Sequence, residues 1–216
     1  MIMKKDKLDI LYEDKYILVV NKPNNLLTIS TDKEKYNTLY SKVYDYLKKK
    51  NKNNKVFIVH RLDKDTSGLV IFAKSEKVKY DLQNNWNNVI RKYICKVYGK
   101  VLNDGVIESY LKETKTHLVY STKDSKNGKY AKTIYKVISY NDNFSLLEVL
   151  IKTGRHHQIR VHLKSINHPI VGDKIYSNIK DNRKRLCLHA YYLEFIHPIT
   201  KENIKLETKI PRELNL

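Results

Sequence analysis

The sequence is poor in cysteine and has no long apolar run. Its two cysteines, Cys95 and Cys187, are far apart and form no CxxC pair, so neither a disulfide framework nor a zinc knuckle is expected. The longest apolar stretches, such as 16–20 and 69–73, have the length of a strand and are too short to cross a bilayer. The first residues, MIMKKD, lack the apolar core of a signal peptide. These absences predict a soluble protein of the reducing cytoplasm with no membrane partner.

Acidic residues are also scarce. The 216 residues include 23 Asp and Glu against 42 Lys and Arg, which gives a formal net charge of +19. A globular protein this basic repels itself, and its usual partner is a polyanion such as nucleic acid. The many Lys, Asn, Ile and Tyr residues offer another explanation, a compositional bias that inflates lysine without any function. Charge alone therefore does not decide the partner.

The hydrophobic pattern predicts a mixture of strands and helices without internal repeats. Helical spacing of apolar residues occurs over 38–49, again after Ser75 as a possible N-cap, and over 155–166. Strands are expected at 16–20, 56–59, 69–73, 91–98, 106–111, 118–122, 131–140 and 144–151, and within 186–211. Because strands and helices do not alternate regularly, we expect an α+β fold with a mixed, largely antiparallel β-sheet core flanked by helices and loops. No shift in composition marks a boundary, so residues 1–216 are expected to form a single domain.

The segment 60–68, HRLDKDTSG, is the most unusual stretch, because polar and turn-forming residues connect two strand-like runs. A carboxylate at a strand edge beside an arginine suits nucleophilic or general-base chemistry, since the arginine opposes the rise in carboxyl pKa that burial causes. Gly68 and the Thr-Ser pair before it could close a tight loop around the acid. The alternative is a polar β-turn with a surface ion pair. The pattern alone does not choose between Asp63 and Asp65.

The same residues also fit DxDxT, the nucleophile motif of haloacid-dehalogenase-type phosphatases. In those enzymes an unbroken apolar strand precedes the motif, and further paired acids hold Mg²⁺. Here His60 and Arg61 interrupt the approach, no Asp-Asp pair occurs in the chain, and the expected fold is not Rossmann-like. A phosphatase is therefore the weaker hypothesis.

A second polar cluster, TGRHHQIRVHL, occupies 153–163. In a helix, His156, Arg160 and Lys164 would share one face, with His157 near it. Such a cationic face could grip phosphate or hold a carboxylate in a salt bridge, whereas a solvated face without function is the plain alternative. The histidines match no common zinc spacing, so no metal is expected.

The order of these motifs resembles that of the RluA-type pseudouridine synthases over nearly the whole chain. HRLDKDTSGL at 60–69 is similar to that family's HRLDxxTSGL signature, and the cluster at 153–163 is similar to its GRxHQIRxH motif. Further matches, in chain order, are the opening strand and Lys-Pro pair at 10–23, the RxYxxxVxG strand at 91–99, KxAxT at 129–133, HPIxGD at 168–173, and the closing LHA and HP pairs within 188–198. The resemblance implies the pseudouridine synthase fold and the isomerisation of specific uridines in ribosomal or transfer RNA.

The resemblance also implies roles for individual residues. Asp63, in the HRLD position, would be the catalytic aspartate, in preference to Asp65. Tyr93, on a strand where it could equally be a core residue, would pack against the flipped base and assist proton removal. Arg160 would pair with Asp63 and hold it charged. Arg61 would help to fill the gap that the extruded uridine leaves in the RNA.

The family's reaction retains every atom of uridine, so no metal, redox cofactor or nucleotide is expected. Attack on the sugar, addition to the base and removal of a ribose proton all stay open as the step that the aspartate performs. RNA is the expected partner and the protein is expected to be a monomer. No S4-like RNA-binding module is recognised, so docking would use the domain's own basic surface. His156 departs from the small or hydroxyl residue usual at its position, which puts one local contact in doubt.

A non-catalytic RNA-binding protein on the same fold is the rival hypothesis from another class. The joint presence of Asp63, Tyr93 and Arg160 argues against it, because a protein that only bound RNA would have no need of this set.

Overall fold

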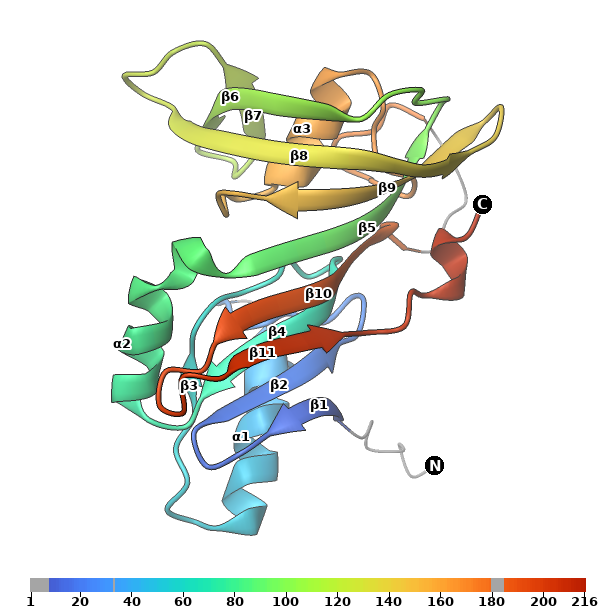
Figure 1. Cartoon of the computed structure of the whole chain (residues 1–216). Helices are drawn as coiled ribbons and strands as arrows, with labels where there is room; N and C mark the ends of the chain where they lie inside the picture. Colours follow the sequence, from blue (N-terminus) through green and yellow to red (C-terminus); the bar gives the residue numbers. More distant parts are fainter. Residues whose placement is uncertain (1–7, 33, 180–184) are drawn as a thin grey trace.

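A computed structural model of the protein describes residues 8–32, 34–179 and 185–216. In this part of the chain an 11-stranded sheet extends through the molecule (Figure 1). Its strands are β1 (Asp9–Glu13), β2 (Ile17–Lys22), β3 (Phe57–Ile58), β4 (Ser67–Ala73), β5 (Ile90–Tyr98), β6 (Gly105–Glu113), β7 (Val119–Thr122), β8 (Lys129–Tyr140), β9 (Phe144–Ile151), β10 (Leu188–Ile196) and β11 (Asn203–Glu207). The helices are α1 (Leu39–Lys50), α2 (Glu76–Asn84) and α3 (Gln158–Ser165), with short 3₁₀ turns η1 (Trp86–Asn88) and η2 (Arg212–Leu214).

The sheet is almost entirely antiparallel. Its strand order is β1-β2-β4-β10-β5-β9-β8-β6-β7, with β11 added to β10 and β3 added to β4. Only β4 and β10 run parallel among the described strands, and they share just two residue pairs, Ser67 with His189 and Gly68 with Ala190. The expected α+β fold with a largely antiparallel sheet is confirmed. The parallel, doubly wound sheet that the phosphatase hypothesis requires is absent from the described strands.

The two faces of the central strands are both covered. In β2, Leu18 and Val20 belong to a core cluster that includes the buried apolar residues of α1 and two of α3, Ile159 and Leu163. By contrast, Ile17 and Val19 belong to a second cluster that includes the buried residues of α2. Neighbouring β4 divides its residues between the same two clusters. Because successive strand residues point to opposite faces, a strand covered on both sides reads as a continuous apolar run, as the sequence does here.

The helix starts follow local capping chemistry. Thr38 accepts a hydrogen bond from the backbone N–H of Ser41 at 3.1 Å, and Ser75 accepts one from Val78 at 3.3 Å, as N-cap residues do. The third helix begins three residues later than expected. His157, with φ of 52°, has a left-handed backbone that a right-handed helix cannot include.

Gly68 lies at the junction of β4 and β10, and not in a loop around Asp63 as the sequence suggested. Its φ is +119°, and a Cβ atom added there would lie 2.1 Å from the carbonyl oxygen of Ala190. The parallel pairing of β4 with β10 therefore depends on a residue without a side chain at this position. This pairing places the start of β4, and with it the preceding polar segment, against β10.

Replacing Gly68 by alanine is expected to destabilise the protein by more than about 2 kcal/mol, because the new methyl group meets backbone in a disfavoured conformation. Urea unfolding would measure the change. The control is Ser125→Ala in an exposed turn, for which less than about 0.5 kcal/mol is expected. Equal stability of Gly68→Ala and the control would contradict the close approach of β4 and β10.

Candidate active site

The polar segment 60–68 is held in place by a buried lysine. Lys22, at the end of β2, is fully buried, and its ammonium donates to the carbonyl oxygens of Pro23, Leu26 and Lys64 at 3.0, 2.7 and 3.0 Å. Burial lowers the pKa of Lys22 to about 7, although the charge of Asp63 opposes this shift. Since three N–H donors meet three carbonyl acceptors, Lys22 connects β2 to the carbonyl group of Lys64, the residue after Asp63.

The residues before Asp63 are fixed by two further contacts. The hydroxyl of Thr28 donates to the carbonyl of Leu62 at 2.7 Å and accepts from the N–H of the same residue at 3.2 Å. The Nε2 atom of His60 accepts from the backbone N–H of Ile71 at 3.1 Å, and its ring lies 4.5 Å from the ring of Trp86. Burial lowers the pKa of His60 to about 3, which keeps Nε2 free to accept near neutral pH. His60 therefore has a structural role.

All four predicted site residues line one cavity of about 230 Å³. The side chain of Asp63 is 24% exposed, Tyr93 and Arg160 are buried, and Arg61 is exposed. A larger hollow of about 490 Å³, between α2 and the β10–β11 turn, shares no lining residue with it. The structure thus gathers into one place residues that lie up to 99 positions apart.

The expected ion pair between Arg160 and Asp63 is not formed. Arg160 instead donates through Nε and Nη2 to the two carboxylate oxygens of Asp173, at 2.8 and 2.7 Å, and both side chains are buried. Burial on its own would lower the pKa of Arg160, but Asp173 and, beyond it, the charge of Asp63 raise it. Asp63 therefore acts on Arg160 electrostatically without contacting it.

The hypothesis of a solvated cationic face on α3 is wrong. Gln158, Arg160 and His162 are buried in the helix, while His156 and His157 precede it in a turn. The side chain of Gln158 accepts from the backbone N–H of Arg155 at 3.0 Å and donates to a β8 carbonyl at 3.0 Å. Gln158 therefore connects the start of α3 to strand β8 by a hydrogen bond.

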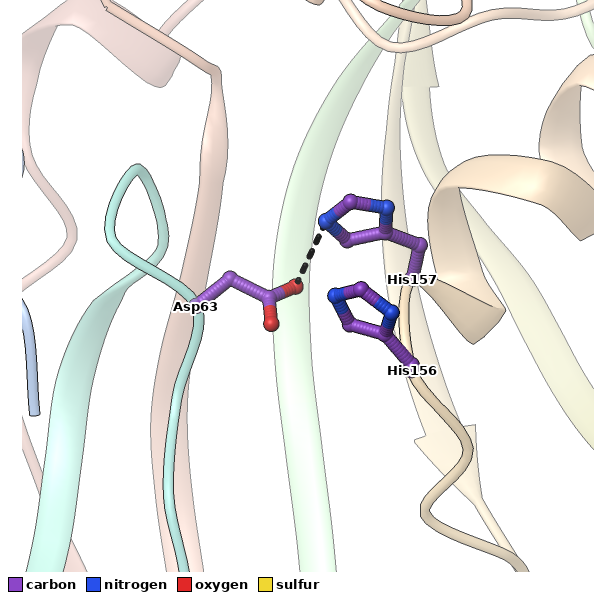
Figure 2. A group of neighbouring side chains, drawn as sticks. All are labelled: Asp63, His156 and His157. Atoms are coloured by element: carbon purple, nitrogen blue, oxygen red, sulfur yellow. Dashed lines mark ion pairs between the residues drawn. The ribbon is translucent and has the colours of Figure 1, made fainter. Parts of the chain in front are cut away.

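His157 is a close neighbour of Asp63, whereas the sequence analysis placed it only near a cationic helix face. Its Nε2 atom lies 3.8 Å from the Oδ2 atom of Asp63 (Figure 2). Its Nδ1 atom is 2.8 Å from the hydroxyl of Tyr176. Burial lowers the pKa of His157 to about 4, with Asp63 opposing and Arg160 adding to the shift. The imidazole is therefore neutral near pH 7 and does not neutralise the carboxylate.

His156 lies directly beside this pair. Its ring centroid is 3.9 Å from that of His157, and its Nδ1 atom is 3.5 Å from the Oε1 atom of Glu113. Asp63, His156 and His157 each offer a ligand atom, and these atoms lie within 4.8 Å of one another. The spacing of the histidines predicted no metal, but the folded chain brings together a set that could hold one.

Arg91 is a second cavity residue that the sequence did not single out. It is buried, its Nε atom has no hydrogen-bond partner within the described ranges, and its guanidinium lies 5.5 Å from the Trp86 ring centroid. Arg91 is two residues before Tyr93 in β5, so strand alternation places both side chains on one face and could have revealed it. Burial raises the pKa of Tyr93 to about 12, with the charge of Arg91 lowering it and that of Asp63 raising it. Tyr93, Arg91 and Asp63 are thus close enough to interact.

The sequence of the chain is similar to those of known RNA-modifying proteins. A family model described as RNA pseudouridylate synthase matches residues 16–165. The chain is 33% identical over 220 residues to ribosomal large subunit pseudouridine synthase D of Nitrosomonas europaea, covering 96% of the chain and 63% of that relative. It is 37% identical over 209 residues to ribosomal large subunit pseudouridine synthase C of Rickettsia prowazekii, covering 94% and 68%. The chain thus spans about two thirds of the length of these relatives.

Solved structures agree on the fold. Human RNA pseudouridylate synthase domain containing 4 superposes with a TM-score of 0.80 at 24% identity, covering 95% of this chain and 90% of that one. Human RNA pseudouridylate synthase domain containing 1 gives 0.76 at 25% identity, covering 94% and 83%. The chain belongs to the RNA pseudouridylate synthase family, which confirms the resemblance. None of the helices in the described ranges is long and apolar enough to cross a membrane.

Asp173→Asn is expected to lower the unfolding free energy at pH 7 by about 3–5 kcal/mol, because Arg160 stays buried without its partner. Burial alone would raise the pKa of Asp173, but Arg160 holds it below its usual 3.8. A lowered folded-state pKa gives stability that is present above pH 3.8 and lost as the pH falls through the folded value. The difference between variant and wild type should therefore shrink in acid.

Urea unfolding at pH 7 and pH 3 would measure this difference. Asp142→Asn, in an exposed turn, is the matched control and should change stability by less than about 0.5 kcal/mol at both pH values. A deficit of Asp173→Asn that stays constant down to pH 3 would show that the ion pair does not supply the stability.

Proposed function

We propose that this protein is an RNA pseudouridine synthase, an isomerase that converts specific uridines to pseudouridine, with Asp63 as its catalytic aspartate. The observation that carries the proposal is the position of Asp63, whose carboxylate lines a cavity together with Tyr93, Arg91 and Arg160. The reaction breaks the N1–C1′ bond of uridine, turns the base and rejoins it through C5. It needs a carboxylate beside the sugar or base, in a pocket that contains the freed base.

The size and charge of the cavity support a nucleotide substrate. At about 230 Å³ it is smaller than the roughly 300–1,000 Å³ of pockets for drug-sized ligands, which suits one everted nucleoside. Four arginines, Arg61, Arg91, Arg155 and Arg160, line it beside one aspartate, so the local charge favours the phosphates of an RNA strand. Eversion of the base costs a few kcal/mol, and phosphate contacts can supply this energy.

Tyr93 is better suited to pack against the base than to remove a proton from it. Its ring is buried at the cavity wall, and burial raises its pKa to about 12. A phenol that stays protonated near pH 7 is a weak general base. Of the two roles that the resemblance implied, stacking is the one that the surroundings of Tyr93 support.

The substrate is proposed to be ribosomal RNA, transfer RNA or both, because relatives of this chain carry names that refer to the large ribosomal subunit. The formal net charge of +19 supports docking through the protein's own basic surface, with binding that weakens steeply as salt rises. The continuous sheet supports treating residues 1–216 as one catalytic domain. We further propose that it acts as a monomer in the cytoplasm, without a cofactor.

Asp63→Asn is expected to reduce tritium release from [5-³H]uridine RNA to background while RNA binding is largely preserved, because the variant keeps the shape of the side chain but lacks the charged oxygen. Asp65→Asn, in the same loop, is the matched control and should keep most of the activity. Filter binding with the same RNA separates loss of catalysis from loss of docking. Activity in Asp63→Asn together with its loss in Asp65→Asn would refute the assignment.

Arg61→Ala is expected to lower kcat/KM more for a uridine in a stem than for the same uridine in a loop. The exposed Arg61 is proposed to fill the space that the everted base vacates, and eversion costs least where the base is unpaired. Two hairpins that differ only in the pairing of the target uridine would measure the effect. Lys64→Ala removes a neighbouring exposed charge outside the cavity and should weaken both substrates alike. Equal losses from Arg61→Ala on both hairpins would contradict the gap-filling role.

A further inference from the structure

Three side chains with metal-binding atoms converge at the mouth of the proposed active site. Asp63 comes from segment 60–68, and His156 and His157 come from the turn before α3. Figure 2 shows a ring nitrogen of each histidine facing the carboxylate of Asp63. The side chains of Asp63, His156 and His157 are 24%, 31% and 10% exposed, so the cluster is shielded but open to an ion from solvent.

The distances suit one small ion after a modest adjustment. Zn²⁺ binds histidine nitrogen and carboxylate oxygen at about 2.0–2.2 Å, so two ligand atoms at a tetrahedral angle lie roughly 3.3–3.6 Å apart. His157 Nε2 and Asp63 Oδ2 are 3.8 Å apart, and all three ligand atoms lie within 4.8 Å of one another. Side-chain rotations that shorten the longest of these separations by about 1.5 Å or less would complete the set.

The far ring nitrogen of each histidine has a polar neighbour outside the cluster. The Nδ1 atom of His157 is hydrogen-bonded to the hydroxyl of Tyr176 at 2.8 Å, and the Nδ1 atom of His156 is 3.5 Å from a carboxylate oxygen of Glu113. A hydrogen bond to the far ring nitrogen is the usual support of a metal-binding histidine, because it holds the ring in one orientation. These neighbours leave Nε2 of each ring for the ion.

The backbone explains why two consecutive histidines can act together. Adjacent residues in a helix point about 100° apart, from 3.6 residues per turn. The left-handed conformation of His157, with φ of 52°, breaks that arrangement, and the two rings lie with centroids 3.9 Å apart. The juxtaposition is therefore a property of this turn.

We propose that Asp63, His156 and His157 form a site for one divalent transition-metal ion of the Zn²⁺ class, and that the bound ion excludes uridine from Asp63. Two imidazoles and one carboxylate suit Zn²⁺, Co²⁺ or Ni²⁺ better than Mg²⁺ or Ca²⁺, which prefer oxygen ligands. Three protein ligands leave the remaining position to water. Arg61, Arg91 and Arg160, which line the same cavity, oppose a cation, so occupancy depends on the metal concentration and the ion acts as a reversible inhibitor.

Direct metal binding tests the site without reference to catalysis. The full chain, freed of metal by dialysis against EDTA, is titrated with Co²⁺ by visible absorption, and Zn²⁺ is then added to displace it. One Co²⁺ per chain is expected, with displacement by Zn²⁺ and none by Mg²⁺. His156→Ser should weaken binding at least about ten-fold. His117→Ser, which removes an exposed histidine that also contacts Glu113, should not. No binding by the wild type, or equal binding by wild type and His156→Ser, overturns the proposal.

The inhibitory part rests on the proposed function and has its own measurement. Tritium release is followed with rising Zn²⁺ at two RNA concentrations, each protein being compared with its own metal-free rate. Zn²⁺ should inhibit the wild type, more RNA should raise the concentration needed, EDTA should restore the rate, and His156→Ser should resist. Metal binding without inhibition refutes the competition at Asp63. Absence of any tritium release from the metal-free wild type instead refutes the proposed function, and the Co²⁺ titration still decides the site.

Discussion

The buried ammonium of Lys22 is the interaction on which the arrangement of the active site depends. Removing a charge from water costs several kcal/mol even after the protein relaxes, and here three carbonyl oxygens compensate for it. One of them belongs to Lys64, directly after Asp63. Movement of segment 60–68 would leave one of the three N–H donors of the buried ammonium without an acceptor, so the burial of Lys22 helps to fix the backbone from which Asp63 extends.

A second buried charge organises the opposite wall of the cavity. Arg160 and Asp173 form a two-point ion pair away from solvent, which ties α3 to the loop that follows it. The guanidinium is therefore committed to a structural contact, and it influences Asp63 only through its charge. Arg160 was expected both to pair with Asp63 and to support it electrostatically. In the structure it pairs with Asp173 and keeps only the electrostatic role toward Asp63.

His157, beside Asp63, affects both the charge of the site and the ligands that the site can bind. An imidazole whose pKa has fallen to about 4 does not neutralise the carboxylate, which keeps its charge available to whatever enters the cavity. Each of the two imidazoles offers one ring nitrogen as a ligand atom, so His156 and His157 are potential metal ligands. The arginines around Asp63 would attract RNA phosphates, and the two imidazoles beside it would favour a transition metal. Which ligand occupies Asp63 then depends on their relative concentrations.

Most of the secondary structure could be predicted from the sequence, which also singled out Asp63 as the proposed reactive acid. Continuous apolar runs predicted β2 and β4, Ser75 marked the start of α2, and the ordered motifs singled out Asp63, Tyr93, Arg160 and Arg61, which the fold gathers around one cavity. The partner of Arg160, which is Asp173, and the position of His156 beside Asp63 became known only from the folded chain, because they depend on how separate segments pack together. Hydrophobic periodicity describes the side of an element that is buried, and it contains no information on a single left-handed residue such as His157 or on distances between side chains from separate segments.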